Sequence, residues 1–280
     1  PGVFNVVSGD DALGAWMTPH PAVRGITFTG STATGKRIAE AAAPDLKRLT
    51  LELGGNDPAI VLDDADVASI APALFKSGFA NNGQVCSCIK RIYAPASLYD
   101  DLVEALAELA RSARVGNGMD DGVDFGPINN EPQFERVAGL VEDAIARGAV
   151  AASGGHRVGD RGYFYAPTIL AGASDEMAVV HEEQFGPALP IVRYDSLDDA
   201  VARANATMFG LDASVWGSDP DRLEAVATQF ECGTAWINTH QARTPDQPTA
   251  GFKWSGIGVE SGRWGYEDLS QVQVLYEARQ

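Results

Sequence analysis

Hydrophobic positions along the chain alternate between short apolar runs and runs spaced like one face of a helix. Apolar runs typical of strands occupy residues 26–29, 49–52, 59–62, 89–94, 189–194, 213–216 and 234–237. Helical spacing, or flanking residues that begin and end helices, marks residues 33–43, 66–79, 98–109, 134–147, 197–205 and 222–229. Strands that alternate with helices of this length predict an α/β fold with a mostly parallel sheet and flanking helices.

Two segments depart from this alternation. Residues 238–258 form a long stretch rich in Pro, Gly and Thr, and loops of such length are usually functional or disordered. Residues 271–276 resemble a lone strand that follows a break at 262–265. A terminal strand without an obvious partner predicts pairing with another chain or another domain.

Composition narrows the possible partners and locations. The chain has 280 residues, is 45% hydrophobic and carries a formal net charge of -17, which allows a real core and disfavours nucleic acid and anionic membranes as partners. No apolar run approaches the roughly 18 residues of a membrane span. Three cysteines make no disulfide framework, so a cytoplasmic location is expected. The N-terminus has no initiator Met or signal pattern, and the sequence reads as though cut from something longer.

Cys86 is the first candidate for chemistry. It ends the segment FANNGQVC, between a predicted helix and a predicted strand. Turn geometry there can aim several backbone N–H groups at one point, and such amides lower a thiol pKa and can hold an oxyanion. The alternative is a small buried hydrophobe, which is what most free cysteines are.

Glu52 is the second candidate, because it lies on the otherwise apolar strand of LELGG. A carboxylate in such a place costs free energy unless it has a purpose or a partner. Burial raises its pKa toward neutrality, as suits a general base. The two glycines that follow would let a flat ligand approach the backbone. The alternative is a salt-bridged Glu at a strand end.

Weaker signals point to a cofactor. The turn at Gly30 and Ser31 follows a strand and opens a helix, where free amides could bind phosphate, although many α/β turns share this form. Glu183 and Phe185 lie beside a Gly-Pro turn. The carboxylate could take ribose hydroxyls while the ring packs on a nicotinamide, or the segment could be a polar loop.

Other patterns are uninformative. The chain has no GxGxxG fingerprint, and Gly256, Gly258 and Gly262 are interpreted as loop glycines. No metal site is predicted, because Cys86 and Cys88 offer no second ligand pair. The histidines, which are scattered and unpaired in the sequence, are His20, His156, His181 and His240.

Taken together, these segments resemble the aldehyde dehydrogenase superfamily along essentially the whole chain. LELGGN is similar to the family's glutamate signature, and FxxxGQxC is similar to its cysteine signature. Cys86 follows Glu52 by 34 positions, in the family's order and spacing. FTGST at 28–32 matches the cofactor turn, and ExFGP at 183–187 matches the nicotinamide-ribose motif.

The resemblance implies oxidation of an aldehyde to a carboxylic acid through a thiohemiacetal and a thioester on Cys86, with Glu52 as the general base. The cofactor would be NAD or NADP. It implies cofactor contacts for Gly9, Gly30, Ser31, Leu53, Glu183 and Phe185. It also implies a partial Rossmann-like cofactor-binding domain at 1–53, a catalytic domain at 54–261, and a C-terminal segment with an oligomerisation strand at 262–280. The expected partners are a small aldehyde and either further copies of the chain or a missing N-terminal half.

Departures from the family keep alternatives open. Family members usually run to nearly twice this length, and the upstream half carries the asparagine of the oxyanion hole. TAGFK at 249–253 replaces the more usual FGGxK. A non-catalytic interaction or scaffold module remains possible, as does a cofactor-independent thioesterase or esterase that uses Cys86 and Glu52. Arg243 could meet a carboxylated substrate or face solvent, and the sequence does not choose between NAD and NADP.

Overall fold

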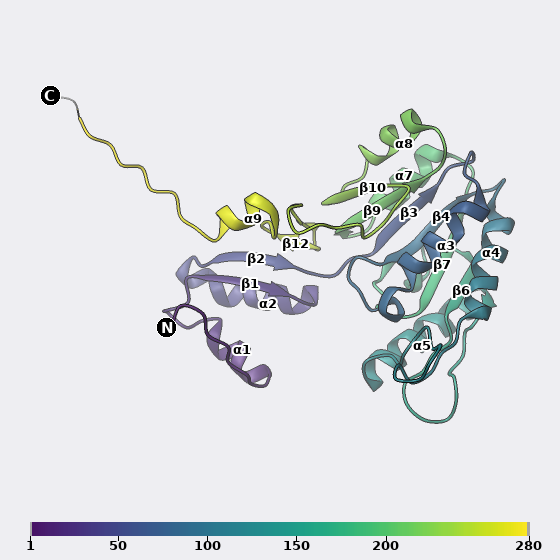
Figure 1. Cartoon of the computed structure of the whole chain (residues 1–280), viewed down its shortest axis with the longest axis horizontal. Coiled ribbons are helices and arrows are strands. Elements are labelled where there is room, and N and C mark those ends of the chain that lie inside the picture. The colour runs from purple at the N-terminus through teal and green to yellow at the C-terminus, as the bar shows by residue number, and fades with distance from the viewer. Residues whose placement is uncertain (1, 279–280) are drawn as a thin grey trace.

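The chain folds into two lobes. The computed structural model describes residues 2–278, and Figure 1 shows a smaller lobe, a larger lobe and an extended C-terminal tail that leaves the smaller one. The smaller lobe holds α1 (Asp11–Met17), β1 (Gly25–Thr29), α2 (Thr32–Ala42), β2 (Arg48–Glu52), β12 (Gly256–Ile257) and α9 (Gly262–Asp268).

The larger lobe contains most of the secondary structure. Its strands are β3 (Asp57–Val61), β4 (Ile89–Pro95), β5 (Val150–Ser153), β6 (Thr168–Ala173), β7 (Ala188–Tyr194), β9 (Asp212–Trp216) and β10 (Thr234–Ile237). Its α-helices are α3 (Val67–Gly78), α4 (Tyr99–Ser112), α5 (Glu131–Ala146), α6 (Ala178–His181), α7 (Leu197–Asn205) and α8 (Pro220–Ala227). A separate short antiparallel pair joins β8 (Phe209–Gly210) to β11 (Phe252–Lys253).

The larger lobe is built on a seven-stranded sheet in the order β10-β9-β3-β4-β7-β6-β5. Every pairing is parallel except that of β5 with β6 at one edge. β3, β4 and β9 are buried along their whole length, because α3 and α4 cover one face while α5, α7 and α8 cover the other. The predicted fold class, α/β with a mostly parallel sheet and flanking helices, is confirmed.

The smaller lobe has a three-stranded sheet in which β2 is central. β1 pairs with β2 in parallel, and β12 pairs with its other edge in the antiparallel sense, with Gly256 opposite Glu52. The sequence predicted only loop at 238–258, and this was wrong at 252–253 and 256–257, which form β11 and β12. Residues after β10 therefore return to the strand that ends in Glu52. The predicted domain boundaries remain predictions.

The predicted break at 262–265 was also wrong. Residues 262–268 form α9 despite their glycines, because tertiary contacts outweigh weak helix propensity. Arg48 donates to the Asp268 carboxylate at 2.6 Å and Thr50 donates to it at 3.0 Å, which fastens the helix to β2. Gly265 packs against the backbone of Glu260, where a larger residue would not fit.

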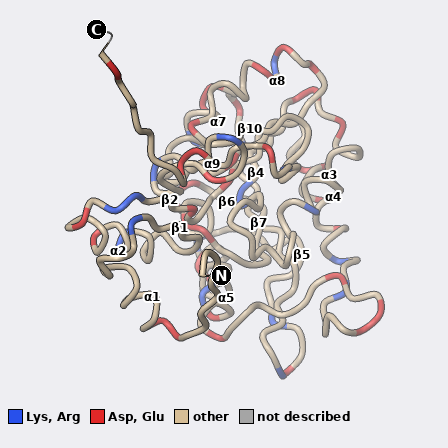
Figure 2. The backbone as a smooth tube through the Cα atoms, turned by 60° about the vertical axis from the view of Figure 1, so that its left-hand side comes forward, with Lys and Arg blue, Asp and Glu red and all other residues tan. Residues whose placement is uncertain are grey.

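The tail beyond α9 forms no strand. Val272 is 97% exposed and Leu275 is 95% exposed, and no strand among residues 2–278 pairs with the segment. Its pairing with another chain stays a prediction. Acidic residues are spread over the outer loops and helices of both lobes (Figure 2). Within the described part of the chain, no helix has the length and apolar character to cross a membrane.

Candidate active site

A tight reversal between α3 and β4 presents Cys86. Asn81, Asn82 and Gly83 have φ values of 47°, 60° and 73°, three successive left-handed residues. Gly83 is required, since a side chain there would collide with the backbone of Gly186. The reversal lifts Cys86 out of the core to the surface of a cleft.

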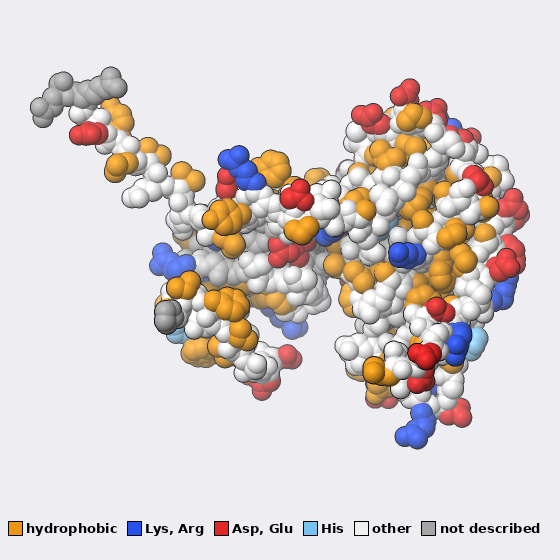
Figure 3. Space-filling model, in the orientation of Figure 1, with side chains coloured by type: hydrophobic (Ala, Val, Ile, Leu, Met, Phe, Trp, Pro, Cys, Tyr) orange, Lys and Arg blue, Asp and Glu red, His pale blue; other side chains and the backbone are white. Residues whose placement is uncertain are grey.

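The cleft has a volume of about 1180 Å³, and the space-filling view shows the molecule hollowed between the lobes (Figure 3). The sequence-predicted site residues that line it are Gly30, Ser31, Leu53, Cys86, Glu183 and Phe185. Residues of both lobes therefore line the same cavity. Glu52 is not a lining residue, but it directly precedes Leu53.

Gly9 is not brought to this cleft. It lies just before α1, and its neighbours Asp10 and Asp11 line a second cavity of about 900 Å³ between α1, β1 and α2. Its cofactor role stays a prediction.

The Cys86 thiol is half-buried, and burial raises its pKa. The charges of Lys90 and Arg243 act in the opposite direction. Among the described residues, no acceptor takes the backbone N–H of Cys86 or of Ser87. Two free amides beside a thiol are the donors that an oxyanion needs.

Glu52 ends β2 with a buried side chain. Burial and the charge of Glu260 raise its pKa to about 7, and the charge of Arg243 opposes them. Its Oε1 is buried with no hydrogen-bond partner in the described residues. Arg243 lowers the pKa of both Glu52 and Cys86, so both groups lie within electrostatic range of one guanidinium.

The two glycines after Glu52 make room for protein atoms. Gly55 N–H donates to Glu183 Oε1 at 3.1 Å, and a side chain at Gly54 would collide with the Glu183 carboxylate. A side chain at Gly55 would meet the Cys86 carbonyl. The glycines therefore let Cys86 and Glu183 approach the strand end, whereas the sequence suggested that a flat ligand would do so.

The cleft has features that suit a dinucleotide. Ser31 caps α2, where its Oγ accepts from the Thr34 N–H at 3.2 Å, and the start of this helix can bind a phosphate. Burial raises the pKa of Glu183, while the charge of Lys90 lowers it. The Phe185 ring is 37% exposed at the cleft. The residues that the sequence predicted to contact a cofactor at the turn of α2 and near Phe185 thus lie along one cavity that also contains Cys86.

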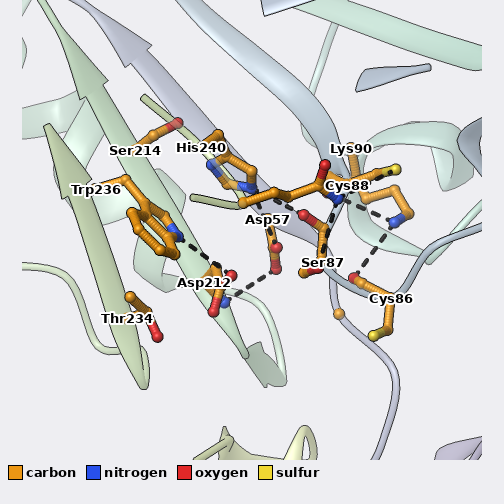
Figure 4. A network of polar contacts seen from close by, with 12 residues as sticks. Asp57, Cys86, Ser87, Cys88, Lys90, Asp212, Ser214, Thr234, Trp236 and His240 are labelled. Atoms are coloured by element: carbon orange, nitrogen blue, oxygen red, sulfur yellow. Dashed lines mark hydrogen bonds and ion pairs between the residues drawn. The ribbon is translucent and has the colours of Figure 1, made fainter. Parts of the chain in front are cut away.

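A buried polar network behind the cysteine loop was missed from the sequence. His240 Nε2 lies 3.6 Å from Asp57 Oδ2 and 2.9 Å from the Ser87 carbonyl oxygen (Figure 4). Arg243 donates to both Asp212 oxygens at 2.7 Å. This corrects the interpretation of His240 as unpaired. Arg243 is an exposed residue, as the solvent-facing alternative expected, but its guanidinium also pairs with Asp212.

The signal for this network was present in the sequence. Asp57 begins an apolar strand, as Glu52 ends one, and the same reasoning about buried carboxylates applies to both. Burial raises the pKa of Asp57 to about 6, against the hydrogen bond of His240. Asp57, Asp212 and His240 bring ligand-type atoms within 4.8 Å of one another. Arg243 already neutralises Asp212, so an ion pair and not a metal accounts for that carboxylate.

Comparisons with known proteins agree on one family. Residues 1–275 match the model of the aldehyde dehydrogenase family. A Staphylococcus saprophyticus protein with a provisional aldehyde dehydrogenase name is 41% identical over 278 residues, which are 98% of this chain and 58% of that protein. The chain thus spans little more than half the length of the curated relatives that it matches.

Solved structures give the same picture. A Mycobacterium tuberculosis aldehyde dehydrogenase complexed with NAD+ is similar with a TM-score of 0.89 and 40% identity, covering 92% of this chain and 54% of that one. An NADP-dependent enzyme of Escherichia coli has a TM-score of 0.92 and 39% identity, covering 95% of this chain and 56% of that one.

Proposed function

The chain belongs to the aldehyde dehydrogenase family, and we propose that it carries the nucleophile, the general base and part of the cofactor site for NAD- or NADP-dependent oxidation of an aldehyde to a carboxylic acid. The observation that carries this proposal is the single cleft that contains Cys86, the Gly30–Ser31 turn, Glu183 and Phe185, with Glu52 next to its wall. Names of similar proteins support either cofactor.

Cys86 acts as the nucleophile. Its thiolate attacks the aldehyde carbon, a C–S bond forms, and the carbonyl oxygen becomes an oxyanion. The free N–H groups of Cys86 and Ser87 can donate to that oxygen. The nicotinamide cofactor, when bound, supplies the hydride acceptor. Loss of hydride from the attacked carbon leaves a thioester on Cys86.

Glu52 acts as the general base for hydrolysis of the thioester. A pKa of about 7 keeps carboxylate present near neutral pH while it remains a useful base. Its unpartnered Oε1 is free to accept a proton from water. The water oxygen attacks the thioester carbon, the C–S bond breaks, and a carboxylic acid leaves as Cys86 returns to the thiolate.

The remaining residues bind and orient the cofactor. The start of α2 at Gly30 and Ser31 holds the pyrophosphate, Glu183 accepts from ribose hydroxyls, and Phe185 and Leu53 pack against the nicotinamide side. Gly9 contacts the adenine end. Burial raises the pKa of Glu183, and Lys90 and the Gly55 N–H oppose that shift by favouring its charged form.

The assembly and location are part of the same proposal. Residues 271–276 pair with a strand of a neighbouring subunit, or the chain associates with an upstream half that supplies the rest of the cofactor site. A reducing cytoplasm keeps Cys86, which is a free thiol, in its reactive form. Because relatives carry much sequence outside the matched region, turnover by this chain alone is expected to be weak.

A panel of aldehydes with NAD and NADP tests the proposal, with reduced cofactor as the readout. Any aldehyde-dependent reduction is expected to disappear in Cys86→Ala and to persist in Cys232→Ala, a matched thiol control outside the cleft. Cofactor reduction that survives in Cys86→Ala contradicts the proposal. So does a wild-type chain whose Cys86 forms no covalent adduct with any aldehyde or activated ester.

A further inference from the structure

Lys90 is a buried lysine in β4 whose ammonium group lies behind the cysteine loop. The residue is 2% exposed. Its Nζ donates to the carbonyls of Val85 at 2.5 Å, Cys86 at 3.4 Å and Cys88 at 3.5 Å. A protonated amine has three hydrogens to donate, and carbonyls can only accept. The surroundings of Nζ are therefore built for a cation.

Lys90 differs from other lysines that are held in place. Lys47 lies 3.3 Å from the Asp45 carboxylate, and Lys253 lies 2.7 Å from that of Glu231. No ion pair among the described residues includes Lys90; backbone carbonyls accept its hydrogen bonds, and the Phe185 ring lies 5.9 Å from its ammonium group. Burial of a cation without a paired carboxylate costs free energy, which a functional role at this position explains.

The hydrogen bonds of Lys90 fix the direction of two peptide groups. In a trans peptide, the C=O of one residue and the N–H of the next point in opposite directions. Because the Val85 and Cys86 carbonyls point to Lys90, the N–H groups of Cys86 and Ser87 point away from it. These are the two amides that no acceptor among the described residues takes.

The rest of the loop is held from the same inner side. The Ser87 carbonyl faces His240 Nε2 at 2.9 Å, so every carbonyl from Val85 to Cys88 meets a buried side chain. Figure 4 shows the Lys90 ammonium next to the Cys86 carbonyl, with the Cys86 sulfur directed away from it.

We propose that Lys90 is a positioning residue for the nucleophile: its ammonium group holds the Val85 and Cys86 carbonyls inward, which turns the Cys86 and Ser87 amides toward the substrate, and its charge stabilises the Cys86 thiolate. The proposal rests on the proposed role of Cys86. Lys90 itself is buried and does not line the cleft.

Charges from four elements act on the thiol. Burial raises the pKa of Cys86, and Lys90 of β4 is the strongest of the charges that lower it. Arg243, in the stretch after β10, also lowers it, while Asp57 of β3 and Glu183 after α6 raise it. Removal of the Lys90 charge therefore shifts the balance toward a higher thiol pKa and less thiolate at neutral pH.

The test is alkylation of Cys86 by iodoacetamide across a range of pH, with each cysteine quantified by peptide mass spectrometry. In Lys90→Met, the pH midpoint for Cys86 is expected to rise and alkylation near neutral pH to slow by about tenfold or more, since one pKa unit is a tenfold change in thiolate. Lys90→Gln, which keeps polar atoms but no charge, is expected to show the same direction and carries the test should the Met variant fail to fold.

Lys47→Met is the matched control, because Lys47 is also buried and donates to the carbonyls of His20 and Val23, in the other lobe. It is expected to leave the Cys86 profile unchanged. Unchanged alkylation of Cys232 in every variant shows that the effect is local. Wild-type alkylation of Cys86 in both folded Lys90 variants, over the whole pH range, overturns the proposal.

Alkylation needs neither aldehyde nor cofactor, so this test stands whether or not the chain turns over an aldehyde. If the wild-type protein is active and the Lys90 variants are alkylated as the wild type is, only the proposed role of Lys90 is contradicted. A second readout follows from positioning: in turnover assays, the Lys90 variants are expected to lose kcat with KM little changed, because the amides act in the transition state.

Discussion

The larger lobe buries its sheet between helices on both faces, whereas the smaller lobe leaves much of its sheet uncovered. β4 is buried at every position, but β1 alternates between exposed and intermediate positions, and α1 has no buried residue. Yet Glu52, on the smaller lobe's central strand, is only 6% exposed. Arg243 and the larger lobe's Asp212 act on its pKa, so the end of β2 lies close to the larger lobe.

The two lobes provide different reacting groups. The larger lobe provides a thiol on a loop held by Lys90 and His240. The smaller lobe provides a carboxyl whose pKa burial raises to about 7. Because Asp212 of the larger lobe also acts on the pKa of Glu52, that carboxyl does not have its environment from its own lobe alone. The following predictions test this division.

The largest effect is expected at the thiol. Cys86→Ala should abolish covalent acylation of the protein by an activated nitrophenyl ester, since it removes the sulfur that forms the bond. Intact-protein mass spectrometry measures the adduct. Cys232→Ala, the control, should acylate as wild type does. An adduct of unchanged yield in Cys86→Ala would place the nucleophile elsewhere.

Substitution of a buried leucine in the larger lobe and of an exposed leucine in the smaller lobe should differ next. Leu74→Ala in α3 removes a fully buried side chain and should lower the free energy of unfolding by about 2–5 kcal/mol in urea titrations. Leu46→Ala in the smaller lobe, where Leu46 is 89% exposed, should change it by less than about 0.5 kcal/mol. Equal losses for the two variants would contradict the difference in packing.

The smallest effect concerns the charge beside the base. Glu260 raises the pKa of Glu52, so Glu260→Gln should lower that pKa and keep the carboxylate form to lower pH. The acid limb of acyl-enzyme hydrolysis should then move to lower pH by a fraction of a unit. Stopped-flow hydrolysis rates across pH measure the shift. Movement to higher pH would show that the sign of the Glu260 effect is wrong.

Much of the larger lobe could be predicted because its buried strands and amphipathic helices have strong periodicity. The segment 197–205 was predicted as a helix, and α7 has these bounds. Asp66 caps α3 through a bond to the Ala68 N–H, as its place before that helix suggested. Local chemistry sets these elements, so local sequence reveals them.

Elements that depend on distant contacts could not be predicted. β12 has only two residues and exists because it pairs with β2. α9 contains two glycines and is held by Arg48 and Thr50. His240 meets Asp57 across 183 positions of sequence, at 3.6 Å. Within the site, motif spacing in the sequence indicated Cys86 and Glu52. It did not indicate Lys90, because the proposed role of Lys90 depends on hydrogen bonds to three backbone carbonyls that only the folded loop brings together.

The most direct test of the proposed roles, Cys86 as nucleophile and Glu52 as general base, is Glu52→Gln. This substitution keeps the shape of the side chain but removes its ability to take a proton. With an activated ester, wild-type protein should acylate and then hydrolyse the acyl-enzyme at a rate that rises with pH through about 7, as the carboxylate form appears. The variant should acylate at Cys86 and hydrolyse the adduct roughly 10²–10⁴-fold more slowly, so that intact mass shows a persistent acyl group. Wild-type hydrolysis in Glu52→Gln, with the same rise through pH 7, would contradict the role of Glu52.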